Sequence, residues 1–398
     1  MRARRIPLLV SIAAIVAVIA MQAFAINYLG RNNYLPEGSE HWTEDWLIHY
    51  FSKRLDGPHK QVALVFVDAE SLEKAGLPSM PPADRAWLAK LITAVADAGA
   101  LAIGVDFYFK TPTDPAKDES LVSAIRDAGA PVVIAAVDDA FLQTDAQRKF
   151  LRDFIQRTGR TAGHIYLKRS QEIFSLGDRA TRGVDHGPSA QGYPSLTSAI
   201  ASLPQVVSAL GPREIPDGTQ RIDWLLEPKD GETFQRYSAY EILSPPGGAG
   251  APDLKDKIVL IGPDFAGQDQ HTVPYSLGEE QATVFPGVFV QAQALVQILD
   301  NRFFFNWTSR QQFLLLFGIG LVGATAGWLF HNTRGDIVLG LAGTLLIIAF
   351  SVPFFIVRIP LPTALAILAW AVSIWTGQQF RAWQRTGKSI AVEGDRNA

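Results

Sequence analysis

The chain has 398 residues, a formal net charge of −3 and no cysteine. The slightly acidic balance argues against a nucleic-acid partner. The lack of cysteine excludes disulfide bonds, which a chain of this length does not need in order to bury a core.

The first apolar run, residues 6–29, follows the basic N-terminal residues 1–5 and contains no charge. Because about 20 apolar residues of helix cross a bilayer, we predict a transmembrane helix here. The alternative is a cleavable signal peptide, for which Ala23 and Ala25 would form the small-residue cleavage site. An uncleaved anchor is favoured, since the run continues to Leu29, beyond the length that a signal peptide needs.

Residues 30–310 form a predicted extracytoplasmic domain, which opens with aromatic residues at helical spacing. Such a stripe is typical of core or interface packing and not of a ligand cage. Its members are Trp42, Trp46, Tyr50 and Phe51.

Short apolar runs and amphipathic stretches alternate through the rest of this domain. Strands are predicted at residues 62–67, 101–105, 132–137 and 257–261. Helices are predicted at residues 84–98, 121–128 and 286–299. A more mixed region lies between residues 163 and 243, with hairpin-like pieces such as residues 221–226. The alternation predicts an α/β domain with a mostly parallel sheet and covering helices.

Three apolar runs follow in succession, so we predict an all-α membrane part of four transmembrane helices. These last three runs cover residues 311–330, 337–357 and 359–380. Pro353 is expected to kink the third helix of the four. The remaining residues, 381–398, are a short cytoplasmic tail that is too small to fold alone. We therefore expect the chain to lack an output module of its own.

Basic residues beside the spans indicate the orientation, because they favour the cytoplasmic side. Basic clusters lie within residues 1–5, between the second and third spans, and within residues 381–398. All three are cytoplasmic if the large domain lies outside, and Arg358 is the exception. We predict a multi-pass membrane protein with both termini in the cytoplasm.

The second span carries a face of small residues, Gly320, Gly323 and Gly327. Small residues let helix backbones approach closely, which is how spans associate in lipid. The face fits packing within the chain's own four helices, and it also fits a homo-oligomer.

Acidic residues follow three of the predicted strands. Asp68 ends the first strand, Asp106 the second, and Asp264 a later one. Ligands of open α/β sheets bind at the carboxyl ends of strands, so these residues form a candidate ligand-binding site that Glu70 and His271 could reach. Three carboxylates suit a hard cation or a cationic solute. The alternative is that the aspartates only cap their own loops.

Catalytic motifs are not evident. The chain has no glycine-rich loop that would cradle a phosphate, and Ser189 and Ser195 lack the nucleophile-elbow pattern. The histidines at positions 164, 186 and 271 are too scattered to indicate a metal triad. We expect no enzyme activity and no cofactor, and leave the question of a metal open.

Several segments together resemble the CHASE2 extracytoplasmic sensor domain of bacteria. In the family's order they are VALVFVDAESLEKAG, DRAWLAKLITAVADAGALAIGVDFYF, AGHIYLKRSQEIFSLGDRATRG, PSLTSAIA, KIVLIGPDFAGQDQHTVPYS and PGVFVQAQALVQIL. The resemblance covers roughly residues 35–300. It implies a sensor of the bacterial plasma (inner) membrane, with one span before the domain and three after it. Many relatives continue into a cyclase or kinase, and here the short tail follows instead.

Two functions of different classes fit these observations. In the first, a sensor detects a solute or protein outside the membrane and relays the signal through its spans. The relay would reach a second copy of the chain or a separate membrane signalling partner. In the second, the chain is a structural or assembly subunit of a membrane complex and has no small-molecule ligand. The sequence does not separate the two.

Overall fold

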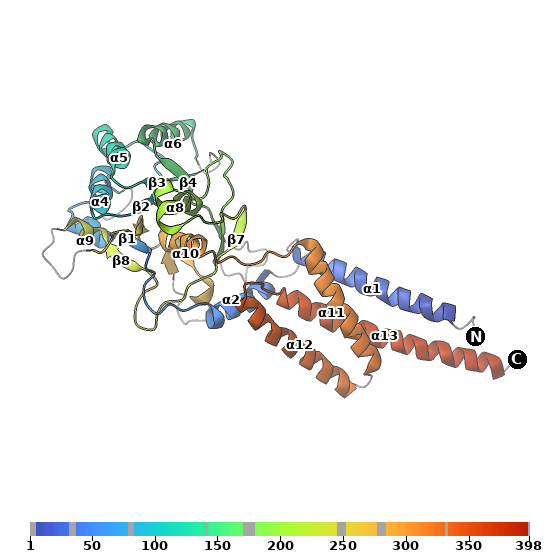
Figure 1. The fold of residues 1–398 in the computed structure, drawn as a ribbon. Helices are drawn as coiled ribbons and strands as arrows, with labels where there is room; N and C mark the ends of the chain where they lie inside the picture. The colour runs from blue at the N-terminus through green and yellow to red at the C-terminus, as the bar shows by residue number, and fades with distance from the viewer. Residues whose placement is uncertain are drawn as a thin grey trace. The chain divides into compact units, whose positions relative to one another are not determined.

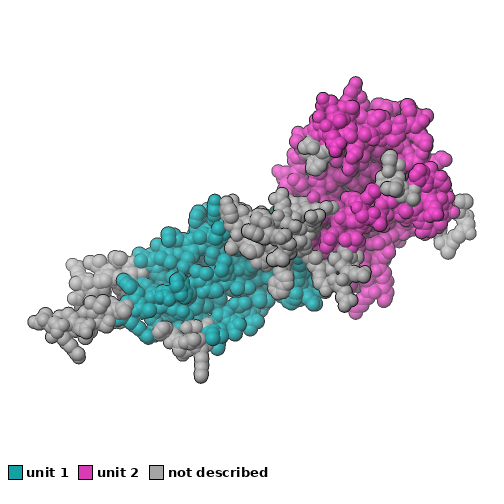
Figure 2. Space-filling model, turned by 180° about the vertical axis from the view of Figure 1, so that it is seen from behind, with its two compact units in different colours: residues 1–51, 171–177, 305–398 teal, residues 52–170, 178–304 magenta. Residues whose placement is uncertain are grey.

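The computed structural model describes residues 5–31, 37–78, 83–137, 139, 142–169, 180–244, 252–276, 284–330 and 333–396. They form two compact units (Figures 1 and 2). We call the described part of residues 52–304 the sheet unit. We call the described part of residues 1–51 and 305–398 the helical unit. The outer limits of 30 and 310 that the sequence suggests for the extracytoplasmic domain stay a prediction.

A six-stranded parallel sheet forms the centre of the sheet unit. Its order is β4-β3-β2-β9-β1-β8, and all neighbouring strands are parallel. The strands are β1 (Val62–Asp68), β2 (Ala102–Val105), β3 (Val132–Ala136), β4 (Thr161–His164), β8 (Gln235–Ser238) and β9 (Ile258–Asp264). The prediction of a mostly parallel α/β sheet with covering helices is confirmed.

The helices that connect these strands cover one face of the sheet (Figure 1). They are α3 (Ala69–Lys74), α4 (Arg85–Asp97), α5 (Pro115–Asp127), α6 (Asp145–Thr158) and α9 (Ala239–Leu243). Their starts follow from local sequence, since Asp84 and Asp114 cap α4 and α5, and Thr144 forms a capping box with Gln147 at α6. Alternate strand residues, among them Val65 and Ile103, pack against this layer.

The other face of the sheet is covered by α7 (Leu196–Ala201) and by α10 (Gly287–Leu299), of which α10 is labelled in Figure 1. Glycines on the strands allow these helices to approach closely. A Cβ atom at Gly104 would lie 2.6 Å from Ile200 of α7, and one at Gly262 would lie 2.5 Å from Val288 of α10. At Gly262 the close atom is the Cβ of Val288, which cannot move away easily, so this position requires a residue without a side chain. Helix α8 (Pro204–Leu210) follows α7.

Two small antiparallel sheets complete the sheet unit. One contains β5 (Leu167–Arg169), β6 (Thr181–Asp185) and β7 (Thr219–Arg221), and the other contains β10 (Gln270–Thr272) and β11 (Val284–Pro286). A 3-10 turn, η3, covers Pro274–Ser276.

The sequence predicts a hairpin-like piece at residues 221–226, and this is wrong beyond Arg221. Strand β7, which ends at Arg221, pairs with β6, and the Ile222 N–H still donates to the Arg182 carbonyl of β6 at 2.9 Å. Beyond Ile222 the segment is bonded by side chains of α10, and Leu226 at its end pairs with the backbone of residues 53–55. The Gln293 side chain accepts a hydrogen bond from the Leu225 N–H and donates one to the Leu225 carbonyl, both at 3.0 Å. Gln297 accepts from the Asp223 N–H at 3.2 Å.

The helical unit consists of five helices: α1 (Arg5–Arg31), α2 (Glu37–Phe51), α11 (Ser309–Leu329), α12 (Thr333–Ile356) and α13 (Thr363–Arg396). Pro353 lies within the last turn of α12, and the helix ends three residues later.

Three of these helices, not the predicted four, are long and apolar enough among the described residues to cross a membrane. They contain Ile12–Gly30, Ser309–Leu329 and Ile337–Ile356. The predicted span at residues 359–380 does not qualify. Two prolines keep its first residues out of the helix, so α13 begins at Thr363, and Gln378 and Gln379 interrupt its apolar stretch. About 22 Å of apolar helix remains, less than the ~30 Å hydrocarbon core.

The small-residue face of α11 lies against α1 and α13. A Cβ atom at Gly320 would lie 2.8 Å from a side chain of α1, and one at Gly323 would lie 3.1 Å from the Trp370 carbonyl oxygen. A Cβ atom at Gly327 would overlap the Ile374 carbonyl oxygen. In the structure, these glycines bring helices of one chain together, which is one of the two uses that their spacing suggests.

We predict that Gly327→Ala lowers the apparent melting temperature of the full chain in lipid nanodiscs by several degrees. The added methyl group must push the α13 backbone away, and overpacking of this kind costs about 1–3 kcal/mol. Gly318→Ala is the matched control on the same helix, because a Cβ atom there meets nothing within 4 Å. Equal melting temperatures for the two variants would contradict the packing described for α11 and α13.

Candidate functional site

The carboxyl ends of β2, β9 and β1 form one edge of the sheet. The chain leaves β1 and β2 toward the face covered by α4 and α5, whereas it leaves β9 toward α10 on the other face. Ligands of parallel α/β sheets bind where neighbouring connections part in this way. Asp68 and Asp264 are register partners at this edge, and the Asp106 N–H donates to the Ile261 carbonyl at 2.8 Å. The three predicted aspartates therefore follow adjacent strands.

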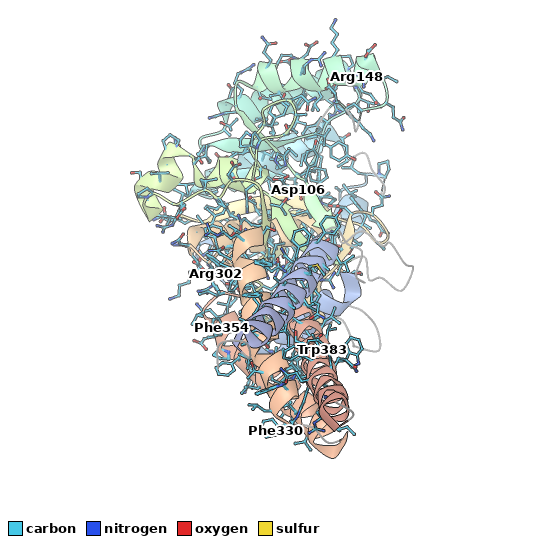
Figure 3. The ribbon with its side chains drawn as sticks, turned by 90° about the vertical axis from the view of Figure 1, so that its right-hand side faces the viewer. Asp106, Arg148, Arg302, Phe330, Phe354 and Trp383 are labelled. Atoms are coloured by element: carbon cyan, nitrogen blue, oxygen red, sulfur yellow. The ribbon has the colours of Figure 1, made fainter. Side chains whose placement is uncertain are left out.

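Asp106 is the buried acid of this edge (Figure 3), with an exposed fraction of 6%. No described residue forms a hydrogen bond with its side chain. Burial raises the pKa of the Asp106 carboxyl well above its usual range, and the nearby Asp269 carboxylate raises it further. A buried carboxyl group without a partner is costly to keep charged. Asp106 is therefore poised to hold a proton or to face a positive charge.

Asp269 and His271 form the other half of the site, in the loop and strand that follow β9. The His271 Nε2 atom lies 3.1 Å from Asp269 Oδ1, and its Nδ1 atom lies 2.7 Å from the Thr181 hydroxyl on β6. His271 is buried, while the Asp269 side chain is 44% exposed. The predicted residue His271 thus links the acidic loop to the small antiparallel sheet.

The Asp269 carboxylate lies against the first residue of α10. The Gly287 N–H donates to the Asp269 carbonyl at 2.9 Å, and a Cβ atom at Gly287 would overlap the Asp269 carboxylate. The partial positive charge of a helix N-terminus favours an anion at this place. Asp269 itself has a positive φ of 49°, a conformation that aspartate tolerates better than most residues.

The other predicted site residues have different roles. The Asp68 side chain caps α3 by accepting a hydrogen bond from the Ser71 N–H at 2.7 Å, as the capping alternative predicts. Glu70 is exposed and pairs with Lys74 of the same helix at 2.6 Å. Asp264 is half-buried and accepts from the Gln270 amide at 3.2 Å.

The sequence indicates His271 as a site residue but not Asp269 or Thr181. A carboxylate in a loop, two residues before a histidine on the short strand β10, is a weak local signal for the pair. Thr181 lies ninety positions earlier in the chain, and only the folded sheet brings it to His271. No local pattern could have indicated that contact.

A second buried polar cluster surrounds His186, after β6. Its Nδ1 atom lies 3.2 Å from both the Ser195 and the Ser198 hydroxyl oxygens. Burial lowers the pKa of His186 to about 4, so the ring is neutral at pH 7. Ser195 is the N-cap of α7 and is 1% exposed. A buried capping serine has no access to a substrate, so we interpret this cluster as structural.

The arrangement around Asp106 is suited to binding charge and has no evident catalytic geometry. The described residues contain no cluster of three or more histidine, cysteine or acidic side chains placed to hold a metal ion. Two carboxylates at the edge, one buried and one exposed, instead favour a proton or a cationic group of a solute. The question of a metal, which the sequence leaves open, receives no support from this geometry.

We predict that the stability of the full chain falls as the pH rises through the raised pKa of Asp106. The folded state holds this proton more tightly than the unfolded state, so the stabilisation is complete below about pH 4 and is lost above the folded pKa. Each unit of upward pKa shift corresponds to about 1.4 kcal/mol. Asp106→Asn should flatten this dependence and raise the melting temperature at pH 7.

Apparent melting temperatures between pH 4 and pH 8, in nanodiscs, would measure this effect. Asp153→Asn is the control, because Asp153 is an exposed acid of α6. An unchanged pH profile in Asp106→Asn would show that Asp106 does not titrate as proposed.

The comparisons with known proteins identify a family. A search against family models matches residues 13–325 to the CHASE2 domain, which extends the resemblance noted from the sequence at both ends. No curated protein and no solved structure matches the chain. The matched residues include most of α1, the whole sheet unit and most of α11, so the apolar helices that flank the sheet unit in sequence are part of the match. Since this match spans well over half of the chain, the protein belongs to the CHASE2 family of extracytoplasmic sensor domains.

Proposed function

We propose that this protein is a membrane-anchored sensor that binds a cationic solute at the carboxyl edge around Asp106. In this proposal the helical unit relays the binding event to a separate signalling partner. The observation that carries the proposal is the buried, unpartnered carboxyl group of Asp106 at the edge where α/β sheets bind ligands. Family membership provides the sensory role in general terms.

Electrostatics favour a positive ligand. Burial and the nearby Asp269 carboxylate both raise the cost of ionising Asp106, whose pKa is shifted upward. A bound ammonium or guanidinium group would remove this cost, because an opposite charge favours the ionised carboxylate. Ligand binding and proton loss from Asp106 would then be coupled. The exposed Asp269 would meet the ligand first, since its side chain is 44% exposed.

Helix α10 connects this site, along the chain, to the segment that leads into α11. It begins at Gly287, against Asp269, and ends at Leu299, ten residues before α11 starts. The chain beyond α10 is fixed within the sheet unit by Arg302, whose guanidinium lies 2.9 Å from the Asp223 carboxylate. Both side chains are buried. A shift of the first turn of α10 would therefore be carried along a rigid helix to the residues that lead into α11.

The partner would be another membrane polypeptide, either a second copy of this chain or a separate signalling protein. Helix α12 supports this part of the proposal, because large apolar side chains on it are exposed in the single chain. They are Ile337, Val338, Leu341, Leu345, Leu346 and Phe350. Such a surface suits lipid and also suits a partner helix that packs within the bilayer.

The uncleaved anchor is the form of α1 that we propose. Residues on both sides of the candidate cleavage site contact the other apolar helices. Gln22 donates to the Thr376 hydroxyl at 2.7 Å, and the Asn27 amide lies 3.2 Å from the Ser309 hydroxyl. Removal of the helix would expose these groups and the faces of α11 and α13 beneath it.

A ligand screen on the full chain in nanodiscs would test the sensory function. The probes are spermidine, putrescine, arginine, ammonium, Mg²⁺ and Ca²⁺, each followed by thermal shift at pH 7. We expect at least one organic cation to raise the melting temperature of the parent chain and of Glu70→Gln, but not of Asp106→Asn. Glu70→Gln is the matched control, because it removes an exposed acid from the same edge.

No shift with any probe would remove the ligand-binding proposal and favour the structural or assembly function. A shift that persists in Asp106→Asn would place the binding site elsewhere.

The orientation of the protein can be tested with reporter fusions. The positive-inside bias predicts that a periplasm-dependent reporter is active when inserted near residue 247 and inactive when fused after Lys388. This orientation requires α13 to cross the membrane beside α11, although its apolar stretch is shorter than those of the three helices that qualify as spans. Arg381 of α13 donates to the carbonyl groups of Trp328 and Leu329, both at 2.7 Å, so the part of α13 around Arg381 lies beside the end of α11. Periplasmic activity of the reporter at Lys388 would instead mean that the two ends of the chain lie on opposite sides of the membrane.

A further inference from the structure

Helix α2 packs against the membrane helices through one side only. It belongs to the helical unit and contacts α12 and α13. Leu47 and Ile48 are each 3% exposed, and Asp45 is also buried. These three residues define the inner side of α2.

The opposite side of α2 is aromatic and exposed. Trp46 is 40% exposed and Tyr50, one helical turn later, is 62% exposed. Their rings lie 5.2 Å apart, and the Phe51 ring lies 5.7 Å from Trp46. On a helix that faces water, such large side chains would be on the inner side and acids on the outer side. Here Asp45 is buried and the aromatic rings are exposed, so the outer side of α2 is not built for water.

The connections of α1 and α11 place α2 at one end of the apolar helices. Asn27 near the end of α1 contacts Ser309 at the start of α11, and Gly30 lies against Leu365 near the start of α13. Helix α2 starts six residues after α1 ends. Both chain connectivity and packing therefore bring α2 to the end of the bundle where α11 and α13 begin.

Further aromatic residues collect at this same end. The Trp307 indole N–H donates to the Pro360 carbonyl at 2.7 Å, and its ring lies 5.6 Å from Phe305. Phe305 and Tyr28 are 42% and 51% exposed. Aromatic residues with a polar edge gather where membrane helices reach the headgroup layer. Trp46 and Tyr50 of α2 lie at the same end and extend this group of aromatic residues, which we call the first belt.

Exposed aromatic residues also lie at the opposite end of α11 and form a second aromatic belt. The length of α11 therefore gives the distance between the two belts. The exposed members of the second belt include Trp328, Phe330 and Trp383, the last two labelled in Figure 3. The 21 residues of α11 span about 31 Å at 1.5 Å per residue, close to the ~30 Å of a hydrocarbon core. The first belt, with α2, therefore lies at the boundary between acyl chains and headgroups.

We infer that α2 is an interfacial helix whose Trp46–Tyr50 face lies in the headgroup region of the outer leaflet. Its inner side packs on α12 and α13, and its aromatic side enters the lipid. Because residue 52 begins the sheet unit directly after α2, this contact would anchor the first connection between the two units to the bilayer surface. The inference is independent of the ligand proposed for Asp106.

Single-cysteine spin labelling would test this inference cleanly, because the chain contains no cysteine. The probes are Tyr50→Cys and Trp46→Cys in the full chain in phosphatidylcholine nanodiscs. Collision with oxygen, which enters lipid, is compared with collision with a water-soluble nickel chelate. Leu341→Cys, on the exposed side of α12, is the lipid reference, and Asp145→Cys, whose side chain is 99% exposed in the sheet unit, is the water reference.

We expect labels at positions 46 and 50 to favour oxygen over nickel, with a ratio between those of the two references. A ratio equal to that at position 145 would place this face in water. Protection from both reagents would place it against protein. Either result would overturn the inference, and two labelled positions guard against one variant that fails to fold.

Discussion

Helix α10 has no surface left for water, since every residue from Gly287 to Leu299 is buried. A helix buried all round must pack on both sides and must satisfy each polar side chain it carries. Gln293 and Gln297 meet this demand by bonding the backbone of the segment that follows β7, as a neighbouring strand would. The parallel sheet and the segment that follows β7 pack against the sides of α10, and the candidate site lies at its first turn. All three therefore depend on this helix.

Much of the sheet unit could be predicted from the sequence, because its signals are local. Continuous apolar runs such as residues 62–67 are typical of strands buried on both faces, and Asp84 and Asp114 mark helix starts. The glutamine contacts of α10 could not be predicted, since side-chain amides that replace a strand leave no periodic pattern. The fourth span was overestimated for a related reason. The prediction counts residues 359–380 as one span, whereas α13 begins only at Thr363 and Gln378 and Gln379 end its apolar part.

The candidate site shows the same division. The acids lie together because the strands that they follow are adjacent in the sheet. The alternation of strands and helices along the chain strongly limits the possible orders of the strands. Which acids remain free is decided by contacts that the sequence does not display. Asp68 is occupied by its own helix cap, whereas the Asp106 side chain has no hydrogen-bond partner among the described residues, and its pKa is raised by burial and by Asp269 from a later loop. A buried acid in such a place lowers stability at neutral pH, which is typical of sites retained for function.

The contact between α11 and α13 limits how these two helices can move relative to each other. The two backbones touch at Gly327 and again at Gly377, where a Cβ atom would overlap the Ala324 carbonyl oxygen of α11. With no clearance between the helices, sliding or rotation of one past the other would drive backbone into backbone. At the end of α11, Arg381 of α13 also donates hydrogen bonds to the carbonyl groups of Trp328 and Leu329. The pair must therefore move as a single rod, and any displacement that enters at Ser309 emerges at the far end of α13.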